Sequence, residues 1–541
     1  MQGIDLTQPA GDSRGRRVVG YGRDAMENRV WDTGLLQHAN LLFRRSYVIM
    51  TRPLERDRFP TQEHFVEHGV GNLHVYVHKD QHFVQVSMGD VTAFLIGHAY
   101  DPFEDIREEK TILAKVAAQC AKSGIVDSLP VLKTTTGVYL VGVVTAAGAC
   151  FVQDCCGLMP AYYAETPSGT IITSHAQLAA DLCDLAVDES IREYLNAPFY
   201  SLGIRILPGL KSRFRDLRLL TPNTCLVLPS LEVVRFYPIA DLAPVANGNL
   251  AEICDALCTS MRICAKRWKA AISLSGGIDS RMTLAAANGM YDRFKYFSFV
   301  SSDAEARDAG AAKQICRELR LPHRIFRIPE APELVVDYHA MSSIIEHNTA
   351  YFRTKGMDSE IRKIAYLASK VDFEMEIKSH VSEVARAFYH KKIGMRHFRM
   401  PLRPRDMSNL TKRNLVQRRI LGYMDRAFSE FVTTTRFGDF PQGYDEADMF
   451  YWEHRMSAWG GLVRQGFELS HETTVIYNNR SLLELFLQHS LADRIHDIPQ
   501  MAVIRRLNPA LGDISAVPNR MKRFDRIALE NVFYRLNSWL P

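Results

Sequence analysis

The chain of 541 residues lacks the features of a membrane or exported protein. Its first stretch, M-Q-G-I-D-L-T-Q-P-A-G-D-S-R-G-R-R, has no apolar core of a signal peptide, and no uninterrupted apolar run approaches the length of a membrane span. The ten cysteines all lie between Cys120 and Cys316, and no C-x-x-C pair occurs. Spacing typical of zinc or redox sites is therefore missing, and we expect buried free thiols in a cytoplasmic protein without a membrane partner.

A strong charge imbalance is also missing. Charged residues make up 23% of the chain, hydrophobic residues 47%, and the formal net charge is only +5. This balance is ordinary for a globular protein and argues against nucleic acid as a partner. One local excess of positive charge, Arg386 to Arg405, is interpreted as a solvated surface, with contact to an anionic substrate or carrier as the alternative. No internal repeat or low-complexity segment is present.

The length and the pattern of apolar residues predict two domains after a flexible N-terminus at residues 1–17. In residues 18–240, short apolar runs separated by turn residues predict a mixed layered domain with antiparallel sheets. The stretch Ile239 to Leu250, which contains Pro, Gly and Asn, marks the boundary. The predicted strands are 73–77, 83–86, 138–144, 149–153, 170–173, 224–228 and 233–236, with helices near 106–123 and 177–185.

Residues 241–541 begin with alternating helices and strands, which predict a doubly wound parallel sheet. Such sheets bind ligands beyond the carboxyl ends of their strands. After about Leu334 we expect helices to the C-terminus. The predicted elements are helices at 251–266, from 280 and at 304–319, and strands at 270–274, 296–300 and 323–328.

The segment Ala270 to Met282 reads A-A-I-S-L-S-G-G-I-D-S-R-M. An apolar strand breaks into two glycines flanked by hydroxyl side chains, and a helix follows. Adjacent glycines allow a tight turn and a close approach to a ligand, and the first amides of a helix bind anions. The Lys of a Walker loop is absent, so we interpret the segment as a different kind of pyrophosphate loop rather than a plain turn.

The pattern S-G-G-x-D-S after a strand resembles the asparagine synthetase-like family of ATP pyrophosphatases. In the first half, D-C-C-G-L from Asp154, I-T-S-H from Ile172 and L-P-G from Leu207 look like the family's glutamine amidotransferase-like domain. The resemblance implies an Ntn-type α+β sandwich followed by a pyrophosphatase domain with a helical C-terminal part. It also implies that ATP and Mg²⁺ are bound, with Asp279 helping to hold the metal and Ser298 flanking the adenine; the ATP-binding set is Ser273, Leu274, Ser275, Gly276, Gly277, Asp279, Ser280 and Ser298.

Glutamine-dependent members of the family use an N-terminal cysteine as nucleophile. Here position 2 is Gln2, and the first cysteine is Cys120. Without a terminal thiol we expect no glutaminase activity. The chain resembles the members that lack this cysteine, such as β-lactam synthetases and the macrolactam synthetases of lasso peptides.

The family's second motif, S-G-x-G-x-D-E-L-F-x-G-Y, corresponds best to the segment from Ile377 to Tyr389. With Tyr389 on the motif's Tyr, Glu383 falls in the acidic pair and is the second expected Mg²⁺ ligand and a catalytic candidate. The glycines are replaced by K-S-H-V, which cannot easily adopt positive φ, so we expect this loop to approach ATP differently. The resemblance also suggests Glu453 as a substrate contact and Lys522, in P-N-R-M-K, as a catalytic residue.

These features favour an ATP-dependent amide ligase that forms an acyl-adenylate and releases AMP and pyrophosphate. Its substrates would be a carboxylate and an amine, on small molecules or on a peptide, with a precursor peptide or partner protein as a further candidate. Two alternatives stay open. One is an amidotransferase that uses ammonia from another source, and the other is a catalytically degenerate nucleotide-binding or scaffold protein. The sequence leaves the oligomeric state undetermined.

Overall fold

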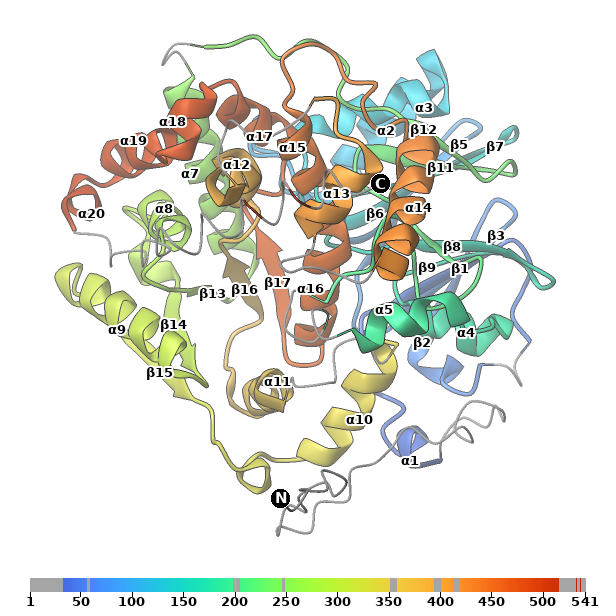
Figure 1. The fold of residues 1–541 in the computed structure, drawn as a ribbon, viewed down its shortest axis with the longest axis horizontal. Helices are drawn as coiled ribbons and strands as arrows, with labels where there is room; N and C mark the ends of the chain where they lie inside the picture. The colour runs from blue at the N-terminus through green and yellow to red at the C-terminus, as the bar shows by residue number, and fades with distance from the viewer. Residues whose placement is uncertain are drawn as a thin grey trace, which may run out of the picture.

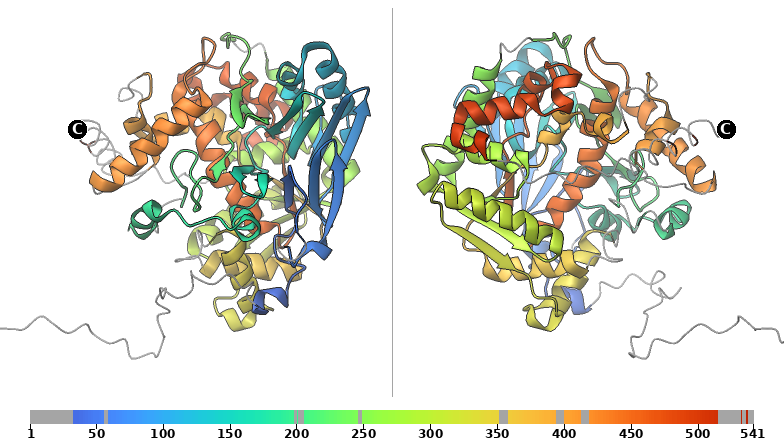
Figure 2. Two further views of the ribbon diagram at one scale, coloured as in Figure 1. Left: turned by 90° about the vertical axis from the view of Figure 1, so that its right-hand side faces the viewer. Right: turned by 60° about the vertical axis from the view of Figure 1, so that its left-hand side comes forward.

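The computed structural model describes residues 33–514 apart from 56–58, 198–199, 201–204, 246–248, 351–357, 394–399 and 412–417, together with residues 532 and 536. The expected flexible N-terminus at 1–17 lies outside these residues. Two antiparallel sheets come from the first half of the chain and a parallel sheet from the second. Figures 1 and 2 show the antiparallel sheets on one side of the molecule and the parallel sheet with its helices on the other.

The first half forms two six-stranded sheets, in the orders β10-β8-β9-β1-β3-β2 and β12-β11-β7-β6-β5-β4. Helix α2 packs on β4 and β5, and α4 packs on β8 and β9. This is the predicted α+β sandwich. Its strands are β1 (Tyr47–Met50), β2 (Phe65–Val70), β3 (Leu73–His78), β4 (Phe83–Met88), β5 (Val91–Tyr100), β6 (Thr136–Thr145), β7 (Gly148–Gln153), β8 (Tyr162–Thr166), β9 (Gly169–Thr173), β10 (Arg218–Leu219), β11 (Thr224–Leu228) and β12 (Glu232–Arg235). Its helices are α1 (Thr33–Leu36), α2 (Glu109–Ser123), α3 (Ile125–Ser128), α4 (Ala176–Cys183) and α5 (Arg192–Asn196).

The second half contains the predicted doubly wound sheet, five parallel strands in the order β15-β14-β13-β16-β17. The strands are β13 (Ala270–Ser273), β14 (Lys295–Val300), β15 (His323–Arg327), β16 (Met375–Lys378) and β17 (Glu472–Val475). Sequence periodicity predicted a mainly helical chain after about Leu334, and β16 and β17 are two short strands that it did not predict.

Helix α7 illustrates why these segments become helical. Its residues Ile253, Leu257, Met261 and Cys264 recur every three or four positions, and all four are buried. The helices of this half are α7 (Leu250–Arg267), α8 (Ile278–Ala286), α9 (Asp303–Glu318), α10 (Tyr338–Asn348), α11 (Asp358–Lys370), α12 (Phe388–Ile393), α13 (Pro404–Thr411), α14 (Arg418–Thr435), α15 (Glu446–Phe450), the π-helix η10 (Tyr451–Gly460), α16 (Gly461–Phe467), α17 (Arg480–Leu487), α18 (Leu491–Ile495), α19 (Ile498–Leu507) and α20 (Pro509–Asp513).

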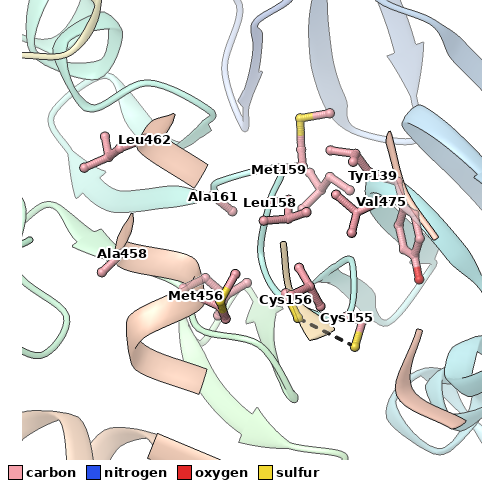
Figure 3. Close-up of a cluster of buried hydrophobic side chains, with 14 of the residues drawn as sticks. Tyr139, Cys155, Cys156, Leu158, Met159, Ala161, Met456, Ala458, Leu462 and Val475 are labelled. Atoms are coloured by element: carbon pink, nitrogen blue, oxygen red, sulfur yellow. Dashed lines mark hydrogen bonds between the residues drawn. The ribbon is translucent and has the colours of Figure 1, made fainter. Parts of the chain in front are cut away.

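The two halves share a hydrophobic core. Figure 3 shows Leu158, Met159 and Ala161 of the first half beside Met456 and Leu462 of the second. The division at residue 240 therefore stays a prediction, because the apolar packing is continuous across it. In the part of the chain that the structure describes, no helix is long and apolar enough to cross a membrane.

Candidate nucleotide site at the switch point of the parallel sheet

The strand order of the parallel sheet places a crevice beside its central strand. From β13 the chain adds β14 and β15 on one side and later adds β16 and β17 on the other. Ligands in such sheets bind where the order reverses, beyond the carboxyl ends of the strands. The loop 274–277 follows β13, and the segment 379–383 follows β16. Both predicted motifs therefore meet at the switch point.

The glycine-rich loop is held in shape by its own hydroxyl groups. Ser280 Oγ donates to the Ser275 carbonyl oxygen at 2.9 Å, and the Gly277 amide donates to Ser275 Oγ at 3.2 Å. Gly276 lies between them, and α8 begins directly after Gly277. A Cβ added to Gly277 would lie 3.3 Å from Ser275 Oγ, which is a tight contact. The loop is thus a compact turn that leads into a helix N-terminus, as a phosphate site requires.

Two of the predicted ATP-binding residues, Leu274 and Ser298, form hydrogen bonds that tie the start of this loop to β14. Leu274 is buried, and its amide donates to the Phe297 carbonyl at 2.8 Å. Ser298 is also buried and donates to the Leu274 carbonyl at 2.6 Å, with His323 Nε2 3.0 Å from its hydroxyl. The Ser298 hydroxyl therefore joins β14 to the first residue of the loop after β13, and its place beside an adenine stays a prediction. Ser273, at the end of β13, is half-buried.

Asp279, in the first turn of α8, is the centre of the polar contacts at the switch point. Its carboxylate accepts hydrogen bonds from Ser382 and from Arg386 Nη1, the latter at 2.6 Å. Burial raises the pKa of Asp279, and the neighbouring charges of Glu383 and Asp497 raise it further, against the opposing effects of Arg386 and Ser382. Glu383 therefore lies close enough to Asp279 to raise its pKa, and its role as a metal ligand stays a prediction.

The second segment adopts a backbone conformation that its sequence argued against. Val381 falls on the second glycine of the family motif and has φ +86°, and Ala387 has φ +50°. A β-branched residue rarely adopts positive φ, and such strain costs about 1–3 kcal/mol. The K-S-H-V loop therefore adopts a positive φ at an unfavourable residue, and this residue is fully buried; its different approach to ATP stays a prediction. The chain thus keeps a glycine-like loop shape without the glycine.

Glu383 lies against the π-helix η10. Tyr451 Oη donates to Glu383 Oε2, and the Arg455 guanidinium lies 4.7 Å from the Phe388 ring centroid and 5.3 Å from that of Tyr451. Arg455 is only 7% exposed, and its Nε has no hydrogen-bond partner in the structure. Tyr451 was not predicted as a site residue, because it lies within the F-Y-W-E-H-R run from Phe450 to Arg455, whose aromatic residues are equally typical of a core.

Glu453, also on η10, does not contact Glu383 but faces the first half of the chain. It has no exposed surface, and its two carboxylate oxygens accept from Arg235 Nη1 and Nη2 at 2.7 and 2.9 Å. Asn223 Nδ2 donates to it as well, at 3.1 Å. These contacts join η10 to the antiparallel sheets, so the predicted substrate contact is corrected to a buried structural ion pair. Lys522 lies outside the described residues.

Tyr477 connects the candidate site to the rest of the molecule. Its hydroxyl lies 2.9 Å from Thr283 Oγ1 on α8, and Thr283 Oγ1 lies 2.8 Å from Ser379 Oγ of the second segment. The next residue, Asn478, donates to the Asp154 carboxylate at 2.9 Å, inside the first half. The Y-N-N-R turn after β17 therefore fixes α8, the second segment and the sandwich relative to one another.

The oxygen ligands present fit a Mg²⁺ ion that is shared with phosphate groups. Mg²⁺ is usually held by one or two carboxylates together with substrate phosphates, and Asp279 and Glu383 supply two. Within the described ranges, no group of three or more His, Cys, Asp or Glu side chains could hold a metal without such help. A bound Mg²⁺ would offset phosphate charge here, whereas this chain's own contribution is the loop, its helix N-terminus and the two carboxylates.

Comparison with known proteins agrees with the fold and motif at this site. Residues 255–371 match the family model of asparagine synthase, and they include the loop, α8 and strands β13 to β15. This part of the chain is asparagine synthase-like. The family is one of ATP-dependent amide-forming ligases, and the matched residues contain the glycine-rich loop. No curated protein matches the chain.

Two solved structures are distantly similar. One is the glutamine phosphoribosylpyrophosphate amidotransferase from B. subtilis complexed with ADP and GMP, at 9% identity and a TM-score of 0.23. The other is the allosteric regulatory enzyme of purine biosynthesis, at 9% identity and a TM-score of 0.24. Each match covers 54% of this chain and 61% of the other, so the chain spans less than two thirds of their length.

Proposed function

We propose that the protein is an ATP-dependent amide ligase that activates a carboxylate as an acyl-adenylate and transfers the acyl group to an amine. The observation that carries this proposal is the S-G-G-x-D-S loop at the switch point, with Asp279 beside Glu383 and Arg386. In the reaction a carboxylate oxygen attacks the α-phosphorus of ATP and pyrophosphate leaves. The amine nitrogen then attacks the acyl carbon, AMP leaves, and the amine gives up a proton. Positioning and charge stabilisation are the protein's main tasks.

We further propose that the amine belongs to the substrate and is not supplied by glutamine. The ten cysteines are unpaired thiols, of which Cys258 is partly exposed and the rest are buried. A buried thiol whose pKa burial raises, such as Cys156 or Cys264, is a poor nucleophile. These observations favour an enzyme of the β-lactam or macrolactam synthetase type. The metal would be Mg²⁺, for which the carboxylates of Asp279 and Glu383 are suitable ligands.

The experiment is to incubate the protein with ATP, Mg²⁺ and a panel of carboxylates that carry an amine, and to measure AMP and pyrophosphate. We expect both products in equal amounts, and the Asp279→Asn variant should lower their rate by about 100-fold or more. Release of ADP and phosphate instead would contradict the mechanism. Thermal unfolding of the variant controls for loss of the fold.

The same assay separates the alternatives. AMP formation that requires ammonium and a carboxylate without an amine would indicate an ammonia-using amidotransferase. The ion pair between Arg386 and Asp279 is the observation that favours a nucleotide-free scaffold, because it occupies a carboxylate that catalysis requires. Calorimetry with α,β-methylene-ATP and Mg²⁺ tests that alternative, since a scaffold would show no metal-dependent binding.

A further inference from the structure

Arg386 occupies the carboxylate that the glycine-rich loop would offer to a metal ion. Its Nη1 lies 2.6 Å from Asp279 Oδ2, while Ser382 donates to Oδ1. Both oxygens of Asp279 therefore have a protein partner. A divalent cation that binds this carboxylate must therefore share it with these two donors, of which only Arg386 carries a positive charge. Ser382 is neutral and bonds through a hydroxyl that can stay beside a metal-bound carboxylate, whereas a guanidinium and a divalent cation repel each other.

Arg386 is held at a second point that does not depend on Asp279. Its Nε and Nη2 donate to the two carboxylate oxygens of Asp497 at 2.7 and 3.1 Å. Lys391 Nζ donates to the same carboxylate at 2.5 Å. The Arg386 side chain is only 13% exposed, so this fork keeps the guanidinium at the edge of the loop when Nη1 is free.

We infer that Arg386 is a stored counter-charge, which neutralises Asp279 in the empty site and turns its Nη1 to the nucleotide phosphates when a divalent cation binds Asp279. This inference rests on the proposed function. A guanidinium is suited to both partners, since it binds carboxylate and phosphate oxygens with the same planar donors. The metal frees the donor and the phosphates accept it, so each ligand strengthens the binding of the other.

The position of Arg386 in the chain supports this role. It closes the segment from Ser382 to Arg386 that follows the strained Val381, and Ala387 after it also has positive φ. Two unfavourable backbone conformations thus bracket the residues that contact Asp279. Such strain persists where surrounding contacts impose a particular geometry, and here that geometry delivers Arg386 to the loop.

The test uses the variants Arg386→Gln and Lys391→Gln, which remove one positive charge each from the same network. Mn²⁺ alone is titrated into each protein and followed by electron paramagnetic resonance of the free ion. Calorimetry then measures α,β-methylene-ATP at saturating Mg²⁺. For R386Q we expect Mn²⁺ to bind about 10-fold more tightly and the nucleotide about 10-fold more weakly, a change of about 1.4 kcal/mol each. For K391Q, whose ammonium group donates to Asp497 and acts on Asp279 only through space, we expect less than about 3-fold change in Mn²⁺ affinity.

Opposite changes in the two affinities support the inference, because a structural role or misfolding would lower both. Equal affinities of R386Q and the wild type, or a fall in Mn²⁺ affinity, would overturn it. If R386Q does not fold, R386K keeps the charge without the fork, and the same loss of nucleotide affinity is expected. A wild-type protein that binds no Mg²⁺-nucleotide would instead refute the proposed function itself, so the two failures are distinguishable.

Discussion

At the scale of single residues, burial shifts the pKa of several side chains, and His454 shows a large shift with a clear cause. It is buried on η10, its ring stacks on Phe450 at 5.0 Å between centroids, and its Nε2 lies 3.2 Å from the Leu207 carbonyl oxygen, to which it donates. Burial lowers the pKa of His454 to about 3, whereas an unfolded histidine titrates near 6.5. The neutral ring is therefore part of the native structure.

The lowered pKa of His454 makes the folded protein less stable in acid. Between about pH 6.5 and pH 3 the unfolded chain binds a proton that the folded chain does not, so stability falls as the pH falls through this window. At pH 5 the loss is about 2 kcal/mol for His454. We expect His454→Gln, which cannot titrate, to lose about that much less stability between pH 7 and pH 5, as measured by urea unfolding.

Phe428→Leu is the matched control for this prediction. Phe428 packs against the His454 ring at 4.9 Å between centroids, but it carries no proton that titrates. Its variant should be less stable than the wild type by the same amount at both pH values. If H454Q and F428L show the same pH dependence, His454 is not neutral in the native protein.

Site residues could be predicted from the sequence only where the residues that act together are also neighbours in the chain. The loop from Ser275 to Ser280 carries its own signal, because glycines and hydroxyls stand next to each other. Arg386 and Asp497 are 111 positions apart, and Arg386 and Asp279 are 107 apart. No pattern within one segment links such partners, and Arg386 reads as part of a basic surface until the fold brings them together.

At the scale of secondary-structure elements, sequence reasoning found many strands bounded by turn residues and missed others, among them two short strands of the parallel sheet. The strands β16, M-E-I-K, and β17, E-T-T-V, have four residues each and lie among helices. They are strands because they pair in register with β13 and with each other, as in Ile272 with Ile377 and Ile377 with Thr474. Pairing of this kind is a tertiary interaction, which overrides weak local preference.

The loop at Gly209 packs closely against the backbone of helix α14. Gly209 has φ +61°, and a Cβ added there would lie 2.2 Å from the Ala427 carbonyl oxygen on α14. We expect Gly209→Ala to destabilise the protein by more than about 2 kcal/mol, because the clash with backbone adds to the strain of positive φ. The free energy of unfolding in urea measures this effect.

Gly89, in the turn between β4 and β5, provides the comparison. It has φ +57°, and nothing lies within 4 Å of an added Cβ. Gly89→Ala should therefore cost only the backbone strain, about 1 kcal/mol. Equal losses for the two variants would mean that α14 moves away from the Leu207-Pro208-Gly209 loop without cost.

At the scale of the whole molecule, buried polar contacts join the sandwich to the parallel sheet. The Asn479 amide donates to Thr136 Oγ1 at 2.9 Å, next to the bond between Asn478 and Asp154. Together with the pair of Arg235 and Glu453, these contacts span the two halves. The first half thus holds the parallel sheet and its candidate nucleotide site in place through buried hydrogen bonds.

Arg480 tests this view, because it is a fully buried guanidinium that reaches from α17 into the first half. Its Nε donates to Asn223 Oδ1 at 3.0 Å, its Nη2 to the Gln153 carbonyl at 3.3 Å, and its plane lies 5.2 Å from the Phe236 ring centroid. Arg480→Met keeps much of the volume but leaves these acceptors buried and unpaired, so we expect the free energy of unfolding to fall by about 2–4 kcal/mol.

Because the halves share one core, the wild type should unfold in a single urea transition by circular dichroism and by tryptophan fluorescence, whereas in R480M the two transitions should separate. Arg192→Met, at a side chain that is 60% exposed, should change neither the midpoint nor the coincidence of the two signals. An R480M protein that behaves like R192M would show that the Arg480 contacts do not hold the two halves together.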